Sequence, residues 1–158
     1  MYVALTNYTE IIRENLLTDE LFKDSTEEEI DDILEDIENY IIRRIYKRVY
    51  PQKQLDEDKE FYSKTCNLNW ITPEQSDIKK IFVNEKLWQI AISSLNKMDN
   101  EKSPIEKLKC VQAAYQILNN SLNFSSGKDI YAGVDDLIPI FIYVIIKSKP
   151  KRIITNLK

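Results

Sequence analysis

The sequence predicts an all-α fold, a layered bundle of about six or seven helices. Apolar residues recur at steps of three and four along much of the 158-residue chain, and no segment shows the period-two alternation of a half-buried strand. Helix-capping signals, in which serine or threonine precedes proline or acidic residues, also recur along the chain. A chain of this length can bury about two-thirds of its unfolded surface, so its core needs no disulfide or metal.

The first long helix is predicted to follow Ser25 or Thr26, either of which can be its N-cap, with Glu28 or Glu29 closing a capping box. Its apolar stripe consists of Ile30, Ile33, Leu34, Ile37, Ile41, Ile45 and Val49. Pro51 ends this helix, because proline disfavours a helical conformation in the residue before it and cannot continue the hydrogen-bond ladder.

A second helix is predicted over about residues 55–68. Another start signal lies at Thr72, with Pro73 in the first helical position and Gln75 closing a capping box. The stretch after it carries apolar residues at helical spacing, which are interpreted as core. They are Leu87, Trp88, Ala91, Ile92, Leu95 and Met98.

Ser103 and Pro104 start another predicted helix, which is followed by a loop over residues 125–134 that is rich in small and polar residues. The apolar residues on or near one face of this helix are Leu108, Val111, Tyr115, Leu118 and Leu122. Trp70 and Trp88 are interpreted as core-packing side chains rather than as stacking platforms for a ligand.

The last predicted helix contains residues 137–146, all of which are apolar. A helix without a polar face is expected to be fully buried, with neighbours on all sides. It is too short to span a bilayer, which requires about 20 such residues. Asp135 and Asp136 precede the run, where an N-cap and a first-turn acid would favour the helix dipole. Pro139 is expected within about the first turn, where its missing N–H costs little.

The composition excludes several classes of site. Histidine is absent, which removes Ser-His and Cys-His catalytic pairs and histidine-ligated metals. Cys66 and Cys110 lack a metal-type spacing and are interpreted as reduced structural thiols. The two glycines form no phosphate-binding loop motif, so neither a cofactor nor a metal is expected. A net charge of −4 argues against nucleic acid as a partner, and the lack of an N-terminal leader predicts a cytoplasmic protein.

Several blocks of the sequence, taken in order, resemble the vacuolar protein sorting nine (VPS9) domain. The blocks are Tyr50-Pro51, residues 56–60, 70–74 and 87–88, Ser103 to Cys110, Gly133 to Pro139, Ile142 to Lys147 and Pro150 to Leu157. The resemblance covers residues 37–158 and leaves residues 1–36 as an N-terminal helical extension packed on the domain. Nine acids and no base lie at positions 24–38, which is typical of a solvated helix face, with a surface for a basic partner as the alternative.

The resemblance implies roles for three residues. Members of the family are guanine nucleotide exchange factors for small GTPases of the Rab5 type, and an aspartate at the start of this helix helps to expel GDP. Asp135 occupies that position, although from the sequence pattern alone it would be interpreted as a helix cap. Pro139 matches the proline that lines the GTPase-binding surface. Asp136 is expected to act mainly through first-turn electrostatics, with a minor share in binding.

The implied function is to promote GDP release from a Rab5-type GTPase in endosomal vesicle trafficking, without covalent chemistry of the protein's own. Family members continue beyond the Asn156-Leu157 block through helices that supply a tyrosine and a threonine to the GTPase contact. Because these helices are missing from the sequence, a non-catalytic GTPase-binding adaptor or scaffold is the alternative. A monomer is expected, with peripheral endosomal membrane association through the GTPase or through other regions, such as the basic residues 147–158.

Overall fold

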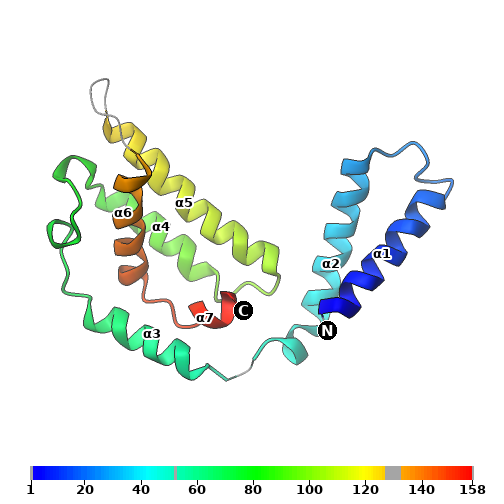
Figure 1. Cartoon of the computed structure of the whole chain (residues 1–158), viewed down its shortest axis with the longest axis horizontal. Helices are drawn as coiled ribbons and strands as arrows, with labels where there is room; N and C mark the ends of the chain where they lie inside the picture. Colours follow the sequence, from blue (N-terminus) through cyan, green and yellow to red (C-terminus); the bar gives the residue numbers. More distant parts are fainter. Residues whose placement is uncertain (1, 52, 127–132, 158) are drawn as a thin grey trace. The chain divides into compact units, whose positions relative to one another are not determined.

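The computed structural model describes residues 2–51, 53–126 and 133–157. Within these residues the chain forms seven α-helices and two short 3-10 helices and contains no β-strand, so the all-α prediction is confirmed (Figure 1). None of the described helices is both long enough and apolar enough to cross a lipid bilayer. The loop predicted over residues 125–134 lies mostly outside the described residues.

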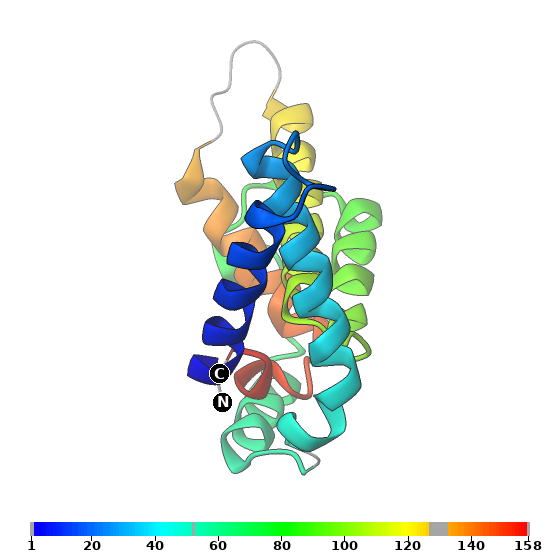
Figure 2. The same cartoon turned by 90° about the vertical axis from the view of Figure 1, so that its right-hand side faces the viewer.

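The chain divides into two compact units, Met1–Tyr50 and Pro51–Lys158. The first unit is a helical hairpin in which α1 (Tyr2–Thr18) and α2 (Glu27–Val49) lie side by side (Figure 2). It is longer than the N-terminal extension expected over residues 1–36, and the packing of that extension on the rest of the chain stays a prediction.

The capping box predicted at the start of α2 is confirmed, with Thr26 and Glu29 as its two members. The Glu29 N–H donates to the Thr26 hydroxyl oxygen at 3.3 Å, and the Thr26 N–H donates to the Glu29 carboxylate at 2.8 Å. Two N–H groups that would otherwise lack partners at the helix start are thereby satisfied. Ile30, in the first turn of the predicted apolar stripe, is buried.

The second unit contains the remaining elements. They are α3 (Asp56–Asn67), η1 (Glu74–Ser76), η2 (Lys80–Phe82), α4 (Glu85–Lys97), α5 (Pro104–Ser126), α6 (Val134–Ser148) and α7 (Ile153–Leu157). Helix α4 packs on both α5 and α6, and α5 also contacts α6 and η2. These elements share one apolar core, formed by Ile78, Phe82, Trp88, Ala91, Leu95, Ala114, Leu118, Leu122, Leu137, Ile140 and Val144.

The start signal at Thr72 produces one 3-10 turn rather than the beginning of the long helix. The predicted cap does form, since the Thr72 N–H donates to Gln75 Oε1 at 2.9 Å and the Gln75 N–H donates to Thr72 Oγ1 at 3.4 Å. Asp77 then adopts a left-handed conformation with a φ of 58°, which ends the turn. Helix α4 begins only after Asn84, whose side chain accepts the Leu87 N–H at 3.2 Å.

The two tryptophans have different environments. Trp88 is buried, as predicted, and its ring centroid lies 5.3 Å from that of Tyr143 on α6. Trp70 is 68% exposed, so its assignment to the core is wrong. It follows the C-terminus of α3 in a turn that carries the chain toward η1, and apolar character alone does not distinguish such a turn residue from a core residue.

Helix α6 is buried along one face only, so the expectation that it is buried on all sides is wrong. Leu137, Ile140 and Val144 recur at helical spacing and are buried. Ile138 and Ile142, on the other side of the helix, are 51% and 53% exposed. A run of apolar residues contains no polar residue to mark a solvent-facing side, and for this reason the sequence pattern could not reveal that face.

The carboxylate of Asp58 holds the start of α7. Asp58 is buried on α3 and accepts the N–H groups of Ile154 at 2.9 Å and Thr155 at 3.1 Å, together with the Thr155 hydroxyl. The first N–H groups of a helix have no partner within it, so Asp58 provides the cap from a different helix. Burial by itself would raise the pKa of Asp58, but these hydrogen bonds outweigh it and hold the pKa below its ordinary value.

The buried face of α5 contains a lysine. The ammonium of Lys107 donates to the carbonyl oxygen of Met98 at 3.1 Å and to Asn156 Oδ1 at 2.7 Å, and Asn156 Nδ2 donates to Asp99 Oδ1 at 2.9 Å. Burial lowers the pKa of Lys107. Leu108, predicted on the apolar face of this helix, is exposed instead, because the buried face runs through its neighbour Lys107.

Two lysine substitutions test the one-sided burial of α6. Val144→Lys places a charge in the core without a partner, which costs on the order of several kcal/mol, so we expect it to abolish the cooperative unfolding transition. Ile142→Lys should remain folded and change the free energy of unfolding by less than about 1 kcal/mol, because its side chain can reach water. Circular dichroism and urea denaturation measure both outcomes. An unfolded Ile142→Lys variant would contradict the assignment of the exposed face.

The lowered pKa of Asp58 predicts a pH dependence of stability. The carboxylate is ionised in the native state to lower pH than in the unfolded chain, so its contribution is complete above the unfolded pKa of about 3.8 and is lost as pH falls through the native pKa. Asp58→Asn should lower the free energy of unfolding at pH 7 by about 1–3 kcal/mol. The difference between parent and variant should shrink below about pH 4.

Asp56→Asn is the matched control for this substitution, since Asp56 lies on the same helix but is exposed and pairs only with the neighbouring Lys59 among the residues described. Urea denaturation from pH 7 to pH 2.5 follows all three proteins. A difference between parent and Asp58→Asn that stays constant over this range would show that Asp58 is not the titrating group.

Candidate functional site

The start of α6 brings two carboxylates, a proline and an exposed apolar face together. Gly133 has an extended backbone, with φ −118° and ψ −178°, and is the N-cap of the helix. Val134 is the first helical residue, so Asp135 and Asp136 occupy the second and third positions. Carboxylates in this turn interact favourably with the positive end of the helix dipole.

Both oxygens of the Asp136 carboxylate are engaged within the second unit. Oδ2 accepts the Gly133 N–H at 3.3 Å, which closes the first turn of α6, and Oδ1 accepts the Lys79 ammonium at 2.7 Å. Lys79 lies between η1 and η2, so the ion pair joins the start of α6 to a loop distant in the sequence. The hydrogen bond from Lys79 lowers the pKa of Asp136.

The Asp135 carboxylate, in contrast, faces solvent. Across the described ranges, no residue donates a hydrogen bond to it or pairs with it. Asp135 does not cap the helix either, because Gly133 is the N-cap and Asp136 makes the reciprocal capping bond. The two adjacent acids therefore differ: Asp136 has partners within the protein, whereas Asp135 has none in the part of the chain that the structure describes.

Pro139 is the sixth residue of α6 and lies in its second turn, so the expectation that it falls in about the first turn is wrong. In a regular α-helix the N–H of residue 139 would donate to the carbonyl oxygen of Asp135. Proline has no N–H, so that carbonyl loses its usual donor. The proline ring itself is half-buried.

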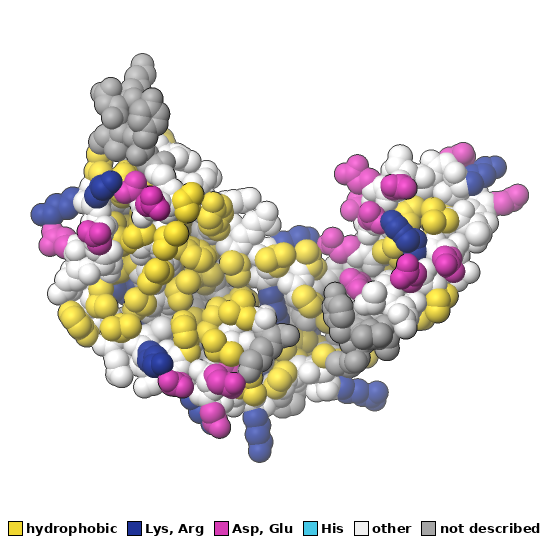
Figure 3. Space-filling view, viewed as in Figure 1, with side chains coloured by type: hydrophobic (Ala, Val, Ile, Leu, Met, Phe, Trp, Pro, Cys, Tyr) yellow, Lys and Arg dark blue, Asp and Glu magenta, His cyan; other side chains and the backbone are white. Residues whose placement is uncertain are grey.

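An exposed apolar stripe continues from this turn along α6. Val134, Ile138 and Ile142 follow one another at four-residue spacing and are exposed, and Asp135 and Pro139 border them on the same side of the helix. Figure 3 shows hydrophobic side chains gathered on this face of the second unit, with acidic side chains near one edge of the patch. Exposed apolar patches of this kind mark surfaces that bind another protein or a ligand.

The sequence pattern and the family resemblance point to three of these site residues, but not to Lys79, Ile138 or Ile142. The structure places Asp135, Asp136 and Pro139 together in the first two turns of α6. Lys79 carried no signal, because a single lysine in a loop does not reveal its partner. Ile138 and Ile142 could have been found: they lie within one turn of Pro139, so a binding surface lined by this proline would include them.

Comparisons with known proteins match two segments of the chain. Residues 88–158 match the family described as Vacuolar sorting protein 9 (VPS9) domain, and residues 3–46 match a domain of unknown function, DUF5601. The first segment contains α5, α6, α7 and most of α4. The second contains most of both helices of the first unit.

Several individual proteins are similar to the chain. It is 32% identical over 142 residues to vacuolar protein sorting-associated protein 9A of Arabidopsis thaliana, which is 87% of this chain and 27% of that protein. It is 27% identical over 140 residues to the Rab5 GDP/GTP exchange factor of Bos taurus, covering 83% and 27% respectively. Receptor-mediated endocytosis protein 6 of Caenorhabditis briggsae is 28% identical over 160 residues, covering 98% and 14%. The chain thus spans about a quarter or less of the length of these relatives.

The second unit is all-α within the described residues and exposes an apolar stripe beside the Asp135 carboxylate, features that are typical of a surface that binds another protein or a ligand. It contains no nucleotide-binding loop motif of its own. Residues 88–158 match the VPS9 domain family and the chain is similar to proteins that are named for it, so the resemblance drawn from the sequence blocks is confirmed.

Proposed function

We propose that this chain is the GTPase-engaging part of a guanine nucleotide exchange factor, which promotes GDP release from a Rab5-type small GTPase in endocytic vesicle trafficking. The single observation that carries the proposal is the exposed Asp135 carboxylate at the head of the exposed stripe on α6, which has no partner among the described residues. The VPS9 family match supports the proposal, and the names of two relatives, a Rab5 GDP/GTP exchange factor and a receptor-mediated endocytosis protein, support the choice of partner and process.

The carboxylate is suited to weakening the grip of a GTPase on GDP. A small GTPase holds the diphosphate through a P-loop lysine, backbone N–H groups and a magnesium ion. A carboxylate placed against that site would compete for the lysine and repel the β-phosphate. Asp135 can be presented in this way because, in the described part of the chain, its charge is not already paired.

The apolar stripe would supply the binding energy for this interaction. Ile138 and Ile142 would be covered by an apolar surface of the GTPase, and Pro139 would line the same surface. A partner shifts an equilibrium only by its differential affinity, so the contact must favour the nucleotide-free GTPase over the GDP-bound one. The repulsion between Asp135 and bound GDP would provide that difference.

The role proposed for Asp136 follows from its geometry. Asp136 fixes the start of α6 through Gly133 and Lys79, with a minor share in GTPase binding. The exchange involves no covalent step, so no nucleophile, metal or cofactor is assigned to this chain. A cytoplasmic monomer, recruited to endosomes through its GTPase, fits this function.

Neutralising Asp135 tests the proposed mechanism. We expect Asp135→Asn to slow GDP release by about 10- to 100-fold, the effect of losing one charge-assisted hydrogen bond to a cation. Its stability should stay within about 1 kcal/mol of the parent, because Asp135 makes no cap. Release of a fluorescent GDP analogue from Rab5-type GTPases measures the rate, and urea denaturation measures the stability. If parent and variant release GDP at the same rate, the carboxylate mechanism is wrong.

Substitution of the exposed stripe tests the binding surface. Ile142→Lys should weaken binding to the nucleotide-free GTPase by about 10-fold or more, because it places a charge in an apolar interface. Ile90→Lys is the matched control, since Ile90 is an isoleucine of α4 with the same exposed fraction, 53%, outside the stripe. Isothermal titration calorimetry compares the variants. Equal losses for both would contradict the assigned surface, and tight binding by the parent without GDP release would favour the adaptor function.

A further inference from the structure

Lys79 is held in place from both sides. Ile78, which precedes it, and Phe82, three residues after it in η2, are buried in the core of the second unit. The Lys79 ammonium lies 5.5 Å from the centroid of the Phe82 ring, a cation–π contact, and 2.7 Å from Asp136 Oδ1. The lysine therefore presents its charge to the start of α6 from a loop that is anchored in the core.

This anchored charge gives the two acids of α6, Asp135 and Asp136, different environments. Adjacent residues on a helix point about 100° apart, so one lysine that approaches Asp136 does not also satisfy Asp135. Asp136 receives both Lys79 and the Gly133 N–H, whereas Asp135 faces solvent. Without the lysine, the Asp136 carboxylate would keep only the Gly133 N–H, and its second oxygen could compete with Asp135 for a cation on the partner.

We infer that Lys79 is a positioning residue for nucleotide exchange: it engages Asp136, fixes the first turn of α6, and leaves Asp135 as the one carboxylate presented to the GTPase. This inference rests on the proposed function and deepens it. Lys79 does not touch the reacting groups and acts through Asp136. The positive charge of Lys79 also offsets one of the two carboxylate charges next to the stripe.

The role is one of orientation rather than of stability. The Lys79 side chain is 63% exposed, and ion pairs with an exposed member contribute little to folding. Loss of the pair should therefore alter exchange much more than the melting temperature. Loss of a lysine with a purely structural role would change both the exchange rate and the melting temperature, or neither.

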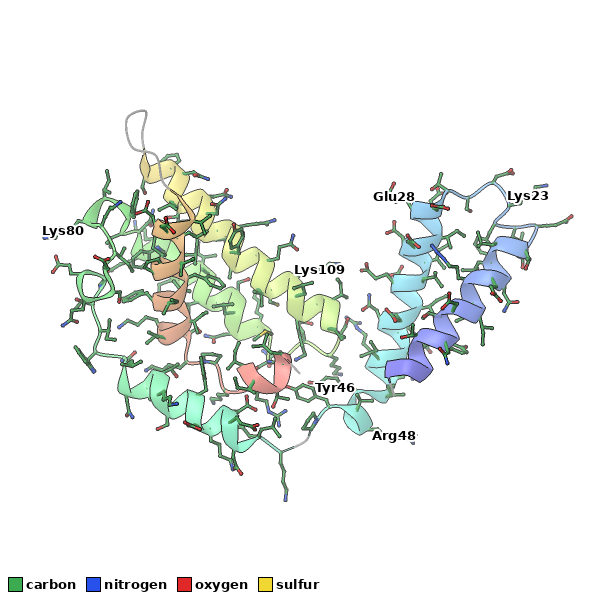
Figure 4. All side chains as sticks on the ribbon, in the orientation of Figure 1. Lys23, Glu28, Tyr46, Arg48, Lys80 and Lys109 are labelled. Carbon is green, nitrogen blue, oxygen red and sulfur yellow. The ribbon has the colours of Figure 1, made fainter. Side chains whose placement is uncertain are left out.

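The neighbouring Lys80 provides a matched control. Lys80 pairs with Glu74 at 2.9 Å, within the same loop region, rather than with α6. Figure 4 shows Lys80 at the outer edge of the second unit, pointing away from the helices. We expect Lys79→Met to lower kcat/KM for GDP release by about 5-fold and Lys79→Arg to restore most of it, because arginine keeps the charge. Lys80→Met should leave the rate unchanged. Equal rates for Lys79→Met and the parent would overturn the inference.

A double-mutant cycle shows whether Lys79 acts through Asp136. If it does, Lys79→Met combined with Asp136→Asn should be no slower than Asp136→Asn alone, since the interaction is already absent. Fully multiplicative losses of rate would mean that Lys79 acts on the GTPase directly, and the positioning role would be wrong. Thermal unfolding of all the variants checks that the fold is retained.

A titration of the free protein separates this inference from the proposed function. Carboxyl-detected NMR follows the ionisation of Asp136 without any GTPase present. Lys79→Met should raise the pKa of Asp136, and Lys80→Met should leave the pKa of Asp136 unchanged. An unaltered Asp136 titration in Lys79→Met would overturn the inference whatever the exchange assay gives. If the titration changes as expected and the parent chain releases no GDP, the proposed function fails while the ion pair itself stands.

Discussion

The packing of one face of α6 on α4 and α5 determines where the functional groups of the second unit lie. Leu137, Ile140 and Val144 enter the shared core, and the Tyr143 ring lies against Trp88. These contacts fix the rotation of the helix about its own axis, and the rotation decides which residues face outward. The exposure of the Asp135 carboxylate and of the apolar stripe is therefore a consequence of core packing, because a rotation of α6 about its axis would turn a different set of residues toward solvent.

Polar contacts hold the segment that follows this helix. Asp58 caps α7 from α3, and Lys107 reaches Asn156 from α5, so each end of this short helix is bonded to a different element. Buried charges are costly unless they are paired or hydrogen-bonded, and both of these groups have several partners. Specific polar bonds thus hold α7 in place, whereas apolar packing holds α6 in place. A five-residue helix has too little surface to be held by packing alone.

Local signals in the sequence predicted several helices correctly, but they did not predict which way those helices face. The Thr26–Glu29 capping box, the proline-led start of α5 and the apolar run of α6 are short-range features, and each produced the expected element. The exposed side of α6 depends on where other helices pack, which periodicity cannot show in a run without polar residues. The ion pair between Lys79 and Asp136 joins residues far apart in the sequence, so no local pattern could predict it. The positions of Asp135 and Pro139 came from the family resemblance, and their environments came only from the structure.

The proline inside α6 has a consequence for how this surface can be mapped. Because Pro139 has no N–H, the main-chain oxygen of Asp135 is left without its usual donor in the same turn that carries the free carboxylate. Side-chain truncation cannot remove a main-chain acceptor, so an alanine scan of the stripe would undercount the hydrogen-bonding capacity of this turn. Replacing Pro139 with alanine would instead supply the missing N–H and close the helical bond, so it is the proline that leaves this main-chain acceptor without its helical donor.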